Sequence, residues 1–489
     1  MEYIKSSISI LMEKWSRGGP LLLIPIVFYF VLYLLIRENG LINDELSLYH
    51  YLTNTDLFNL WKLNWSGAFK FTDSAYLYET PYFRPILNYI YTFGFWLYDN
   101  LSVTPLILNW FILIYLGFIV GSFIDKETEV TKPYLIAAIY LLLPFNFEAA
   151  LFFPNLSDIL IHIIAVKLLL FHISIKEYNI NNVILSSILI LFGLFVKEAA
   201  IIFIMIPLSA ILIKKEKVLI QKNISYLITF LACFTIYYLV RNTFISSNSV
   251  DFSLLTLIIN FIKGSYNFLF MTQDLNISTL VFIPILFLFF QILKSKSTFL
   301  SICIILFITA PVGILQPDER FFHIAYFTLA IIMLNENKKK ILKYIIIISF
   351  IVLSYKVYST FVAKQMRINA KTEFSKYLES EKYLVTILPY RHGNEAEIFF
   401  NGANYYLDDN NIIPILVKER NLLNDMNIKI EKESSQYKIY SNSNVFIPKM
   451  KGDSLLLSDI KIIKMDDTLL LSFGNDKIRI LNMLDKKIK

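Results

Sequence analysis

Charged side chains stand inside or directly beside apolar runs at several places in this sequence. A carboxylate at such a place can take a proton from a hydroxyl or an amine. Arginine and lysine can bind a phosphate and stabilise the negative charge on a departing one. Because ionisable groups are costly in hydrocarbon, we treat these residues as functional candidates. They are Asp44, Glu45, Arg84, Glu148, Asp158, Lys197, Glu198, Arg241, Asp318, Glu319 and Arg320.

The elements that must position these charges are apolar segments of bilayer-spanning length. Of the 489 residues 56% are hydrophobic and only 17% are charged, whereas about a quarter of the residues of a soluble domain are charged. We therefore predict a polytopic α-helical membrane protein with about eleven transmembrane helices. The predicted spans are 20–36, 104–124, 132–151, 156–175, 182–196, 199–213, 224–241, 279–293, 297–315, 320–334 and 341–361.

Loop charges predict the orientation of these spans. With the N-terminus in the cytoplasm, the lysine-rich loops all fall on the cytoplasmic face, as the positive-inside rule requires. Residues 20–36 lack a small-residue cleavage site, so we interpret them as an uncleaved first helix. Residues 252–270 are assigned to an interfacial helix on the outer face, with Asn260 and Lys263 in its polar stripe, because a span there would move the last two lysine-rich loops outside. The loop lysines are Lys126, Lys132, Lys176, Lys214, Lys215, Lys217, Lys222, Lys294, Lys296, Lys338, Lys339 and Lys340.

The chain divides into a transmembrane domain, 1–364, and an extracytoplasmic C-terminal domain, 365–489. The transmembrane domain contains a long first outer loop, 37–103, whose sequence favours interfacial helices with tryptophan and tyrosine anchors. The C-terminal residues contain short β-prone runs separated by Asn, Asp and Gly, which predicts a small α+β domain. We expect a multi-pass protein of the cytoplasmic (inner) membrane. The net charge of +7 is explained by the loops and does not indicate nucleic-acid binding.

Four stretches together resemble the GT-C superfamily of integral-membrane glycosyltransferases. NDEL (43–46) is similar to the acidic pair of the family's first outer loop, and YFRPI (82–86) to its Arg/Lys–Pro element. NLSDILIH (155–162) followed by LFVKEAAI (194–201) is similar to the paired segments of the O-mannosyltransferase-like, TPR-bearing eukaryotic members, although this chain has no TPR repeats and Val196 stands where a serine is common. The resemblance as a whole is to the protein O-mannosyltransferase and aminoarabinose transferase-like families. DERFFHIAY (318–326) is similar to the family's Glu-Arg element. The likeness covers roughly residues 20–335 and does not reach the C-terminal domain.

The resemblance implies a GT-C-like fold and an inverting sugar transfer from a polyprenyl-phosphate donor to a glycan, lipid or protein acceptor. Asp44 would be the general base on the acceptor hydroxyl, and Glu45 would support acceptor binding. The lipid phosphate would be bound by Arg84, with Arg320 and Lys197 as further ligands. The remaining substrate-binding candidates are Asp158, Glu198 and Glu319.

No cofactor is predicted. The five histidines are scattered and form no HExxH motif, and Cys233 and Cys303 lie inside apolar runs without metal-ligand spacing. Many relatives need no metal, whereas relatives of the oligosaccharyltransferase type use a divalent ion, so the metal dependence is left open.

Each candidate also has a purely structural interpretation. Asp44 and Glu45 can cap an interfacial helix, and Arg84 can extend to the lipid headgroups. Lys197 and Glu198 can pair with one another in a turn. Arg320 can pair with Asp318 or Glu319, acids such as Glu148 and Asp158 are common in loops between spans, and Arg241 can be an interfacial anchor.

Two other functions stay open at this stage. A transporter or flippase of lipid-linked sugars would have many spans, but it usually has repeated halves and polar residues near the membrane midplane. Neither is evident here, since the polar candidates gather at one face. A polysaccharide polymerase or ligase also has many spans, but it usually has its long outer loop late in the chain.

Overall fold

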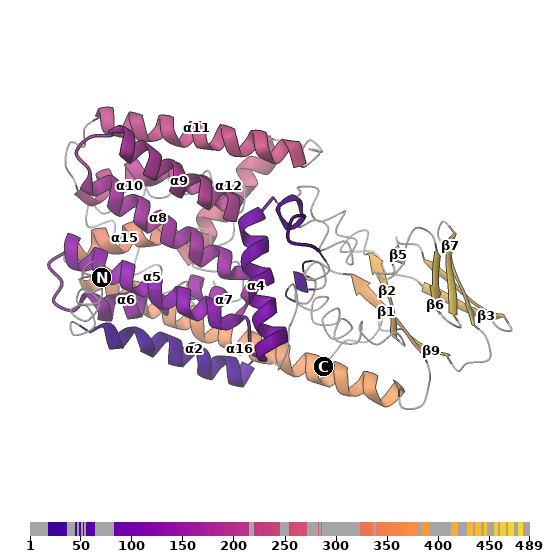
Figure 1. Ribbon diagram of the computed structural model, residues 1–489. Helices are drawn as coiled ribbons and strands as arrows, with labels where there is room; N and C mark the ends of the chain where they lie inside the picture. The colour runs from indigo at the N-terminus through magenta and orange to yellow at the C-terminus, as the bar shows by residue number, and fades with distance from the viewer. Residues whose placement is uncertain are drawn as a thin grey trace. The chain divides into compact units, whose positions relative to one another are not determined.

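We describe the protein from a computed structural model (Figure 1). The described residues are 18–36, 45, 48, 49, 52, 55–63, 83–214, 220–244, 254–270, 282, 285, 323–335, 339–378, 383–390, 412–418, 428–433, 436–441, 445–446, 454–457, 460–465, 468–473 and 478–482.

The chain forms two compact units. The first, a helical unit, comprises Met1–Leu35, Tyr51–Trp65 and Thr80–Tyr358. The second comprises Ile36–His50, Ser66–Glu79 and Ser359–Lys489, and it contains the β-strands. The boundary of 364/365 inferred from the sequence stays a prediction.

The described helices follow the predicted apolar segments, with differences at their ends and at two breaks. They are η1 (Gly19–Leu22), α2 (Leu23–Ile36), η2 (Leu60–Lys62), α4 (Pro85–Leu101), α5 (Leu106–Glu127), α6 (Pro133–Leu141), α7 (Pro144–Leu151), η6 (Phe153–Asn155), α8 (Leu156–Ser174), α9 (Ile180–Val196), η7 (Glu198–Met205), α10 (Ile206–Lys214), α11 (Ile220–Phe244), α12 (Leu254–Phe270), α15 (His323–Asn335) and α16 (Lys339–Leu378).

Among the described residues, four helices are long and apolar enough to cross a membrane, and a bent pair of helices adds a fifth. The four are Leu106–Glu127, Phe153–Ser174, Gln221–Phe244 and Leu342–Val362. Three shorter apolar helices, Gly19–Leu35, Ile180–Val196 and Ile324–Asn335, coincide with further predicted spans. The predicted spans 279–293 and 297–315 lie outside the described residues. The count of about eleven transmembrane helices therefore stays a prediction.

Helix α8 is the centre of the helical unit. It contacts α5, α7, α9, α10 and α15, and 72% of its apolar window is buried. The corresponding shares for α11 and α16 are only 28% and 22%, so these two helices offer apolar surface to their surroundings. In Figure 1, α5, α8, α9 and α11 run side by side across the helical unit.

The predicted span 132–151 is not one straight helix. Helices α6 and α7 are bent by 68° at a short break. Pro144 explains the break, because the residue before a proline is driven out of the helical region and Leu143 is extended, with ψ 147°. The segment is therefore a bent pair of helices, and the span predicted over 132–151 stays a prediction.

Side chains satisfy the backbone carbonyl groups at both ends of α7. At the break, Asn146 donates to the Tyr140 carbonyl (2.9 Å), and Tyr29 donates to the Leu141 carbonyl (2.8 Å). At the other end, the Asn109 amide donates to the carbonyls of Ala149 (2.6 Å) and Phe152 (3.1 Å). Trp110 Nε1 donates to the Ala150 carbonyl (2.9 Å). Hydrocarbon offers no hydrogen-bond partner, so irregular backbone in a membrane has to be satisfied within the protein.

The predicted span 199–213 also differs in its local structure. Its first part is the eight-residue 3-10 helix η7, and only Ile206–Lys214 is an α-helix. A 3-10 helix rises about 2.0 Å per residue against about 1.5 Å for an α-helix, so η7 and α10 extend over roughly 30 Å of chain axis. This explains how a short segment reaches the length of a span.

Helix α4 lies across the ends of other helices in the helical unit. Its Phe95 and Tyr91 rings contact Phe153, directly before α8. Gly94 allows this close approach, because a Cβ added there would lie only 2.2 Å from the Phe153 ring. The sequence predicted helical structure in this part of the first outer loop, and α4 confirms it; an interfacial position in a membrane stays a prediction.

The second unit contains two β-sheets. In the four-stranded sheet, of order β5-β2-β1-β9, the central strand β1 pairs in parallel with β2 (Leu384 opposite Ile412) and with β9 (Tyr383 opposite Ile478). The five-stranded sheet, of order β3-β4-β8-β7-β6, is antiparallel. The strands are β1 (Tyr383–Tyr390), β2 (Ile412–Lys418), β3 (Ile428–Glu433), β4 (Gln436–Ser441), β5 (Val445–Phe446), β6 (Ser454–Leu457), β7 (Ile460–Met465), β8 (Thr468–Phe473) and β9 (Ile478–Asn482).

The two hydrogen bonds from Asn109 generate a stability prediction. Asn109→Ala removes the donor from two carbonyl groups at the end of α7, and an unsatisfied buried polar group costs about 1–3 kcal/mol. We expect a lower thermal unfolding midpoint of the purified protein in detergent. Asn100→Ala is the control, because Asn100 is exposed and donates only within α4. Equal midpoints for the two variants would contradict the role given to Asn109.

Candidate functional site

A partly buried ion pair fixes the start of α4. Arg84 Nε lies 2.9 Å from Glu198 Oε2, with 8% of the Arg84 side chain and 28% of the Glu198 side chain exposed. The other carboxylate oxygen, Oε1, accepts a hydrogen bond from the backbone N–H of Phe83 (3.0 Å). Glu198 thus holds both the arginine and the backbone before it. The two partners are more than one hundred positions apart in the sequence.

The local sequence explains why Arg84 stands at this position. Pro85 is the first residue of α4, where its missing N–H and fixed φ are favourable. A residue that precedes a proline is disfavoured in the helical region, and Arg84 is the non-helical residue before the helix, with φ −131° and ψ 58°.

A second ion pair joins α8 to the break between α9 and η7. Lys197 Nζ contacts Asp158 Oδ1, and both side chains are almost completely buried. Lys197 is extended, with φ −162° and ψ 141°, and successive side chains of an extended segment point in opposite directions. The adjacent residues Lys197 and Glu198 consequently bind different partners. The alternative in which these two residues pair with one another is wrong.

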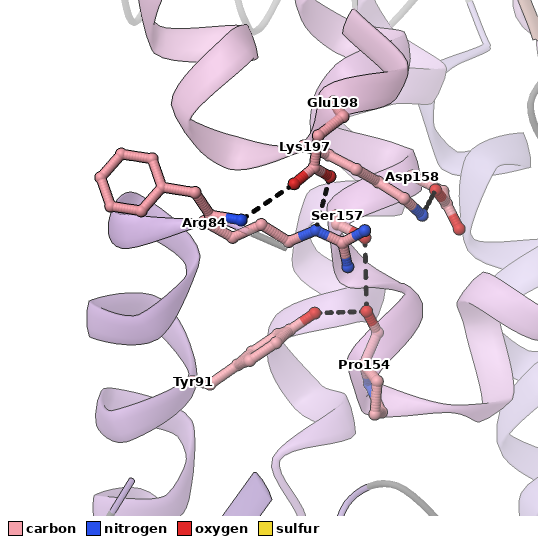
Figure 2. A network of polar contacts seen from close by, with 8 residues as sticks. Arg84, Tyr91, Pro154, Ser157, Asp158, Lys197 and Glu198 are labelled. Atoms are coloured by element: carbon pink, nitrogen blue, oxygen red, sulfur yellow. Dashed lines mark hydrogen bonds and ion pairs between the residues drawn. The ribbon is translucent and has the colours of Figure 1, made fainter. Parts of the chain in front are cut away.

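Hydrogen bonds to one carbonyl close these contacts into a ring. Tyr91 of α4 donates to the carbonyl of Pro154 in η6, and the Ser157 hydroxyl donates to the same oxygen (3.3 Å). Figure 2 shows the ring, which runs from Arg84 to Glu198, through Lys197 to Asp158, and through Pro154 back to α4. Three elements are thereby fixed to one another: the start of α4, the start of α8 and the end of α9.

The ring lies at the end of α8 that is opposite to a predicted cytoplasmic loop. Asp158 is in the first turn of α8, and Lys176 follows the last turn of the same helix. Asp158 is well placed electrostatically, because carboxylates are favoured at helix N-termini. One carboxylate oxygen, Asp158 Oδ2, is buried without a hydrogen-bond partner among the described residues.

The candidates predicted from the sequence are thus divided. Arg84, Asp158, Lys197 and Glu198 come together in the ring. Glu148 is elsewhere, on α7, where its Oε1 lies 3.3 Å from Lys356 Nζ of α16. Glu45 is buried and belongs to the second unit. The candidates that lie outside the described residues are Asp44, Asp318, Glu319 and Arg320.

An aromatic cluster beside the Arg84–Glu198 pair was not singled out from the sequence. We use this name for Trp61, Phe83, Phe195 and Phe244. The Phe83 ring stacks on Phe244 with 5.6 Å between centroids. The Trp61 ring contacts both Phe83 and Phe195. The chain has 42 phenylalanines, so composition alone cannot separate these rings from ones that face lipid.

A turn before Trp61 helps to place this ring. The backbone N–H of Asn59 donates to Asp56 Oδ1 (3.0 Å), and the Asn59 side chain donates to the other oxygen. These bonds hold the pKa of Asp56 below its usual range. Asn88 of α4 donates to the Leu60 carbonyl (2.9 Å), which fixes η2 against α4.

Tyr237 of α11 is the other residue that sequence reasoning missed. Its side chain packs edge-on against Phe195, with 5.6 Å between the ring centroids. Its hydroxyl interacts electrostatically with Glu198, Arg241 and Arg84. Nothing in the sequence distinguishes Tyr237 from the other aromatic residues of the predicted spans.

Within the described parts of the chain, no three His, Cys, Asp or Glu residues are grouped so that they could hold a metal ion. The acids of the ring are both engaged by cations. Each cation of the ring is likewise paired with a carboxylate, and metal dependence stays open.

Comparison with family models, with curated proteins and with solved structures gave no match. Membership of the GT-C superfamily accordingly stays a prediction from the sequence.

The Lys197–Asp158 pair generates a second prediction. Lys197→Met leaves the Asp158 charge buried and uncompensated, which costs about 3–5 kcal/mol. We expect a marked fall in the thermal unfolding midpoint of the purified protein in detergent. The double variant Lys197→Met/Asp158→Leu should recover most of the loss, because an apolar pair of similar volume is often as stable as a buried ion pair.

Lys176→Met serves as the control for this series, because Lys176 is exposed in the loop after α8. Its midpoint should equal that of the wild type. If Lys197→Met and Lys176→Met behaved alike, the buried ion pair would not be a determinant of stability.

Proposed function

We propose that this protein is a GT-C-type membrane glycosyltransferase. It transfers a sugar from a polyprenyl-phosphate donor to an acceptor on the outer side of the cytoplasmic membrane. Asp44 acts as the general base, and Arg84, Lys197 and Arg320 act on the lipid phosphate. The finer architecture of the proposal, with about eleven spans and an extracytoplasmic C-terminal domain, follows the sequence pattern.

The observation that carries the proposal is the convergence of four charged residues at one end of the helices. Arg84, Asp158 and the adjacent pair Lys197 and Glu198 come from distant parts of the sequence but form one partly buried and one buried ion pair in one ring. A buried ion pair is weak evidence for a role in stability, because apolar residues often do as well. Ionisable residues among membrane spans are functional by default. Two of the four stretches that resemble the family, YFRPI and the pair NLSDILIH and LFVKEAAI, contribute described residues to the chemistry proposed.

The proposed step is a single displacement at the anomeric carbon of the donor. The acceptor hydroxyl oxygen forms a bond to this carbon while its proton passes to the Asp44 carboxylate. The bond between the carbon and the phosphate oxygen breaks, and its electron pair leaves with the polyprenyl phosphate. The configuration at the anomeric carbon is thereby inverted. Cations beside the phosphate stabilise the charge that develops on it.

The ion pairs define how the two cations of the ring would act. Arg84 and Lys197 each face one carboxylate, so the ring has no net charge. Arg84 is bound through Nε, and the guanidinium group has five N–H donors in a rigid fork. In the proposal, Glu198 keeps this group oriented toward a phosphate bound beside it. Lys197 has a compact ammonium group and would contact the phosphate while it stays paired with Asp158.

One observation favours a transporter of lipid-linked sugars as the second candidate. Helices α6 and α7 form a bent pair with a break at Leu142–Leu143, and interrupted helices are typical of transporter sites. In transporters such breaks line a polar site near the midplane. Here the freed carbonyl groups of Tyr140 and Leu141 are bound by side chains, which favours a structural role for the break.

A variant of Asp44 tests the proposed function. Asp44→Asn keeps the size of the side chain but removes the proton acceptor, and loss of a general base lowers rates by about 10²–10⁴-fold. The purified protein is incubated with radiolabelled polyprenyl-phosphate sugars, and the release of free polyprenyl phosphate is measured. Asp99→Asn, at an exposed position in the last turn of α4, is the control with unchanged turnover.

Near-wild-type turnover of Asp44→Asn would remove Asp44 as the base. If the wild-type protein moves the labelled lipid across reconstituted vesicles without releasing polyprenyl phosphate, the transporter is correct and the transferase is wrong.

A further inference from the structure

A lysine stands near the middle of one of the helices that are able to cross a membrane. Lys167 belongs to α8, and the apolar segment that contains it runs from Phe153 to Ser174. Long side chains of a helix point toward its N-terminus, so the Lys167 ammonium group is directed toward the centre of this segment. It lies 4.9 Å from the centroid of the Tyr115 ring on α5. Tyr115 is likewise close to the centre of its own segment, Leu106–Glu127.

The contact with Tyr115 does not offset the cost of this position. A lysine at the centre of a bilayer is expensive, and a cation–π contact with a half-exposed ring returns only a part of that cost. The ammonium group does not reach the headgroups at the nearer end, because residues 168–174 add roughly 10 Å of helix axis and the side chain points the other way. A charged Lys167 therefore requires a carboxylate at the same depth.

Four carboxylates of the helical unit are bound to other cations. The pairs are Asp158–Lys197, Glu148–Lys356, Glu198–Arg84 and Glu127–Lys214. Within the described helices no ion pair joins Lys167 to an acid. The positive charge near the centre of α8 is thus not neutralised by these elements.

The sequence narrows the source of a carboxylate further. Of the predicted spans, only 132–151 and 156–175 contain Asp or Glu, namely Glu148 and Asp158. The spans predicted outside the described residues, 279–293 and 297–315, contain neither type. A second copy of the chain would offer the same two acids, and both are bound within its own helices. A carboxylate that meets Lys167 at mid-depth has to come from a different protein.

The surface around Lys167 is accessible to a further helix. Phe111 and Tyr115 lie one turn apart on α5 and are 63% and 46% exposed. Leu160, Lys167 and Phe171 share one side of α8 and are partly exposed. Helices α5 and α8 pack against one another and run side by side in Figure 1. We call these five residues the Lys167 face.

We propose that the Lys167 face binds a transmembrane helix of another membrane protein, which carries an aspartate or a glutamate near its centre. The carboxylate pairs with the Lys167 ammonium group, and the Tyr115 ring contacts the same cation. Opposite charges attract one another strongly in hydrocarbon, because the dielectric constant is low. Headgroup phosphates do not lie at this depth, so charge complementarity selects a helix rather than a lipid. This surface is independent of the glycosyl transfer proposed above and requires α5 and α8 to be membrane spans.

Energy transfer between fluorescent labels in phosphatidylcholine vesicles tests the assignment. The full-length protein is reconstituted with a transmembrane peptide of about 20 leucine and alanine residues that carries one central glutamate. A matched peptide has glutamine at that position, and a third has its glutamate at one end of the apolar stretch. The central-glutamate peptide should bind more tightly than the glutamine peptide by about fivefold to thirtyfold, as one interhelical polar contact provides. The third peptide should bind like the glutamine peptide.

Variants of Lys167 assign this preference to one side chain. Lys167→Met should abolish it, whereas Lys167→Arg keeps the charge and should retain it. Lys343→Met is the matched control, because Lys343 is exposed in the first turn of the apolar window of α16. It should leave the preference unchanged. The thermal unfolding midpoint of Lys167→Met in detergent should not fall, whereas a lysine with a purely structural role would lower it.

Three outcomes would overturn the proposal. The first is equal binding of the central-glutamate and glutamine peptides by the wild type. The second is a preference for glutamate that persists in Lys167→Met, which would place the partner of the acid elsewhere. The third is equally tight binding of the peptide with the terminal glutamate, which would show an attraction at the membrane surface. No sugar donor is present in these measurements, so the proposed function stands or falls separately.

Discussion

The two oxygens of the Glu198 carboxylate hold the start of α4, one through the Arg84 side chain and the other through the backbone of Phe83. This fork fixes both the position and the direction of the residues that enter the helix. The remaining features of the site depend on it. From this backbone position the Phe83 ring contacts Trp61 and Phe244, and α4 then continues to Tyr91, which is bound to η6. Charge-assisted hydrogen bonds of this kind are among the strongest and most directional contacts in proteins.

A single extended residue makes the fork compatible with the second ion pair. Lys197 ends α9 and precedes η7, and its backbone conformation sends two adjacent charges in opposite directions. Had α9 continued as a helix, Lys197 and Glu198 would be separated by about 100° around the helix axis. They could not then bind partners from α8 and α4 in the same way. The break between α9 and α10 is thus part of the site, whereas the break between α6 and α7 is satisfied by neighbouring side chains.

The sequence predicted the features that depend on local pattern. Apolar runs located most described helices, and Asp158, Lys197, Glu198 and Arg84 were recognised because charge is rare beside such runs. Short β-prone runs of the C-terminal residues, such as KYLVTILPY (382–390) and TLLLSFG (468–474), contain the strands β1 and β8, because β-prone residues bounded by turn residues favour strands. The pairing of Arg84 with Glu198 could not be predicted, since it depends on how distant segments pack. Pro144 is a sequence signal for the bend between α6 and α7, but the prediction of a span over 132–151 was based on the length of the apolar run. Tyr237 looked like any aromatic residue of a span.

Helix α16 is one uninterrupted helix of 40 residues, Lys339–Leu378, without a proline or glycine. About 20 residues suffice to cross hydrocarbon, so the polar second half of this helix continues as a stiff rod of roughly 1.5 Å per residue beyond that length. In a rod, every inserted or deleted residue rotates the helical residues that follow by about 100°. Within α16, an insertion or deletion therefore keeps the later residues on their original faces only when it adds or removes whole helical turns.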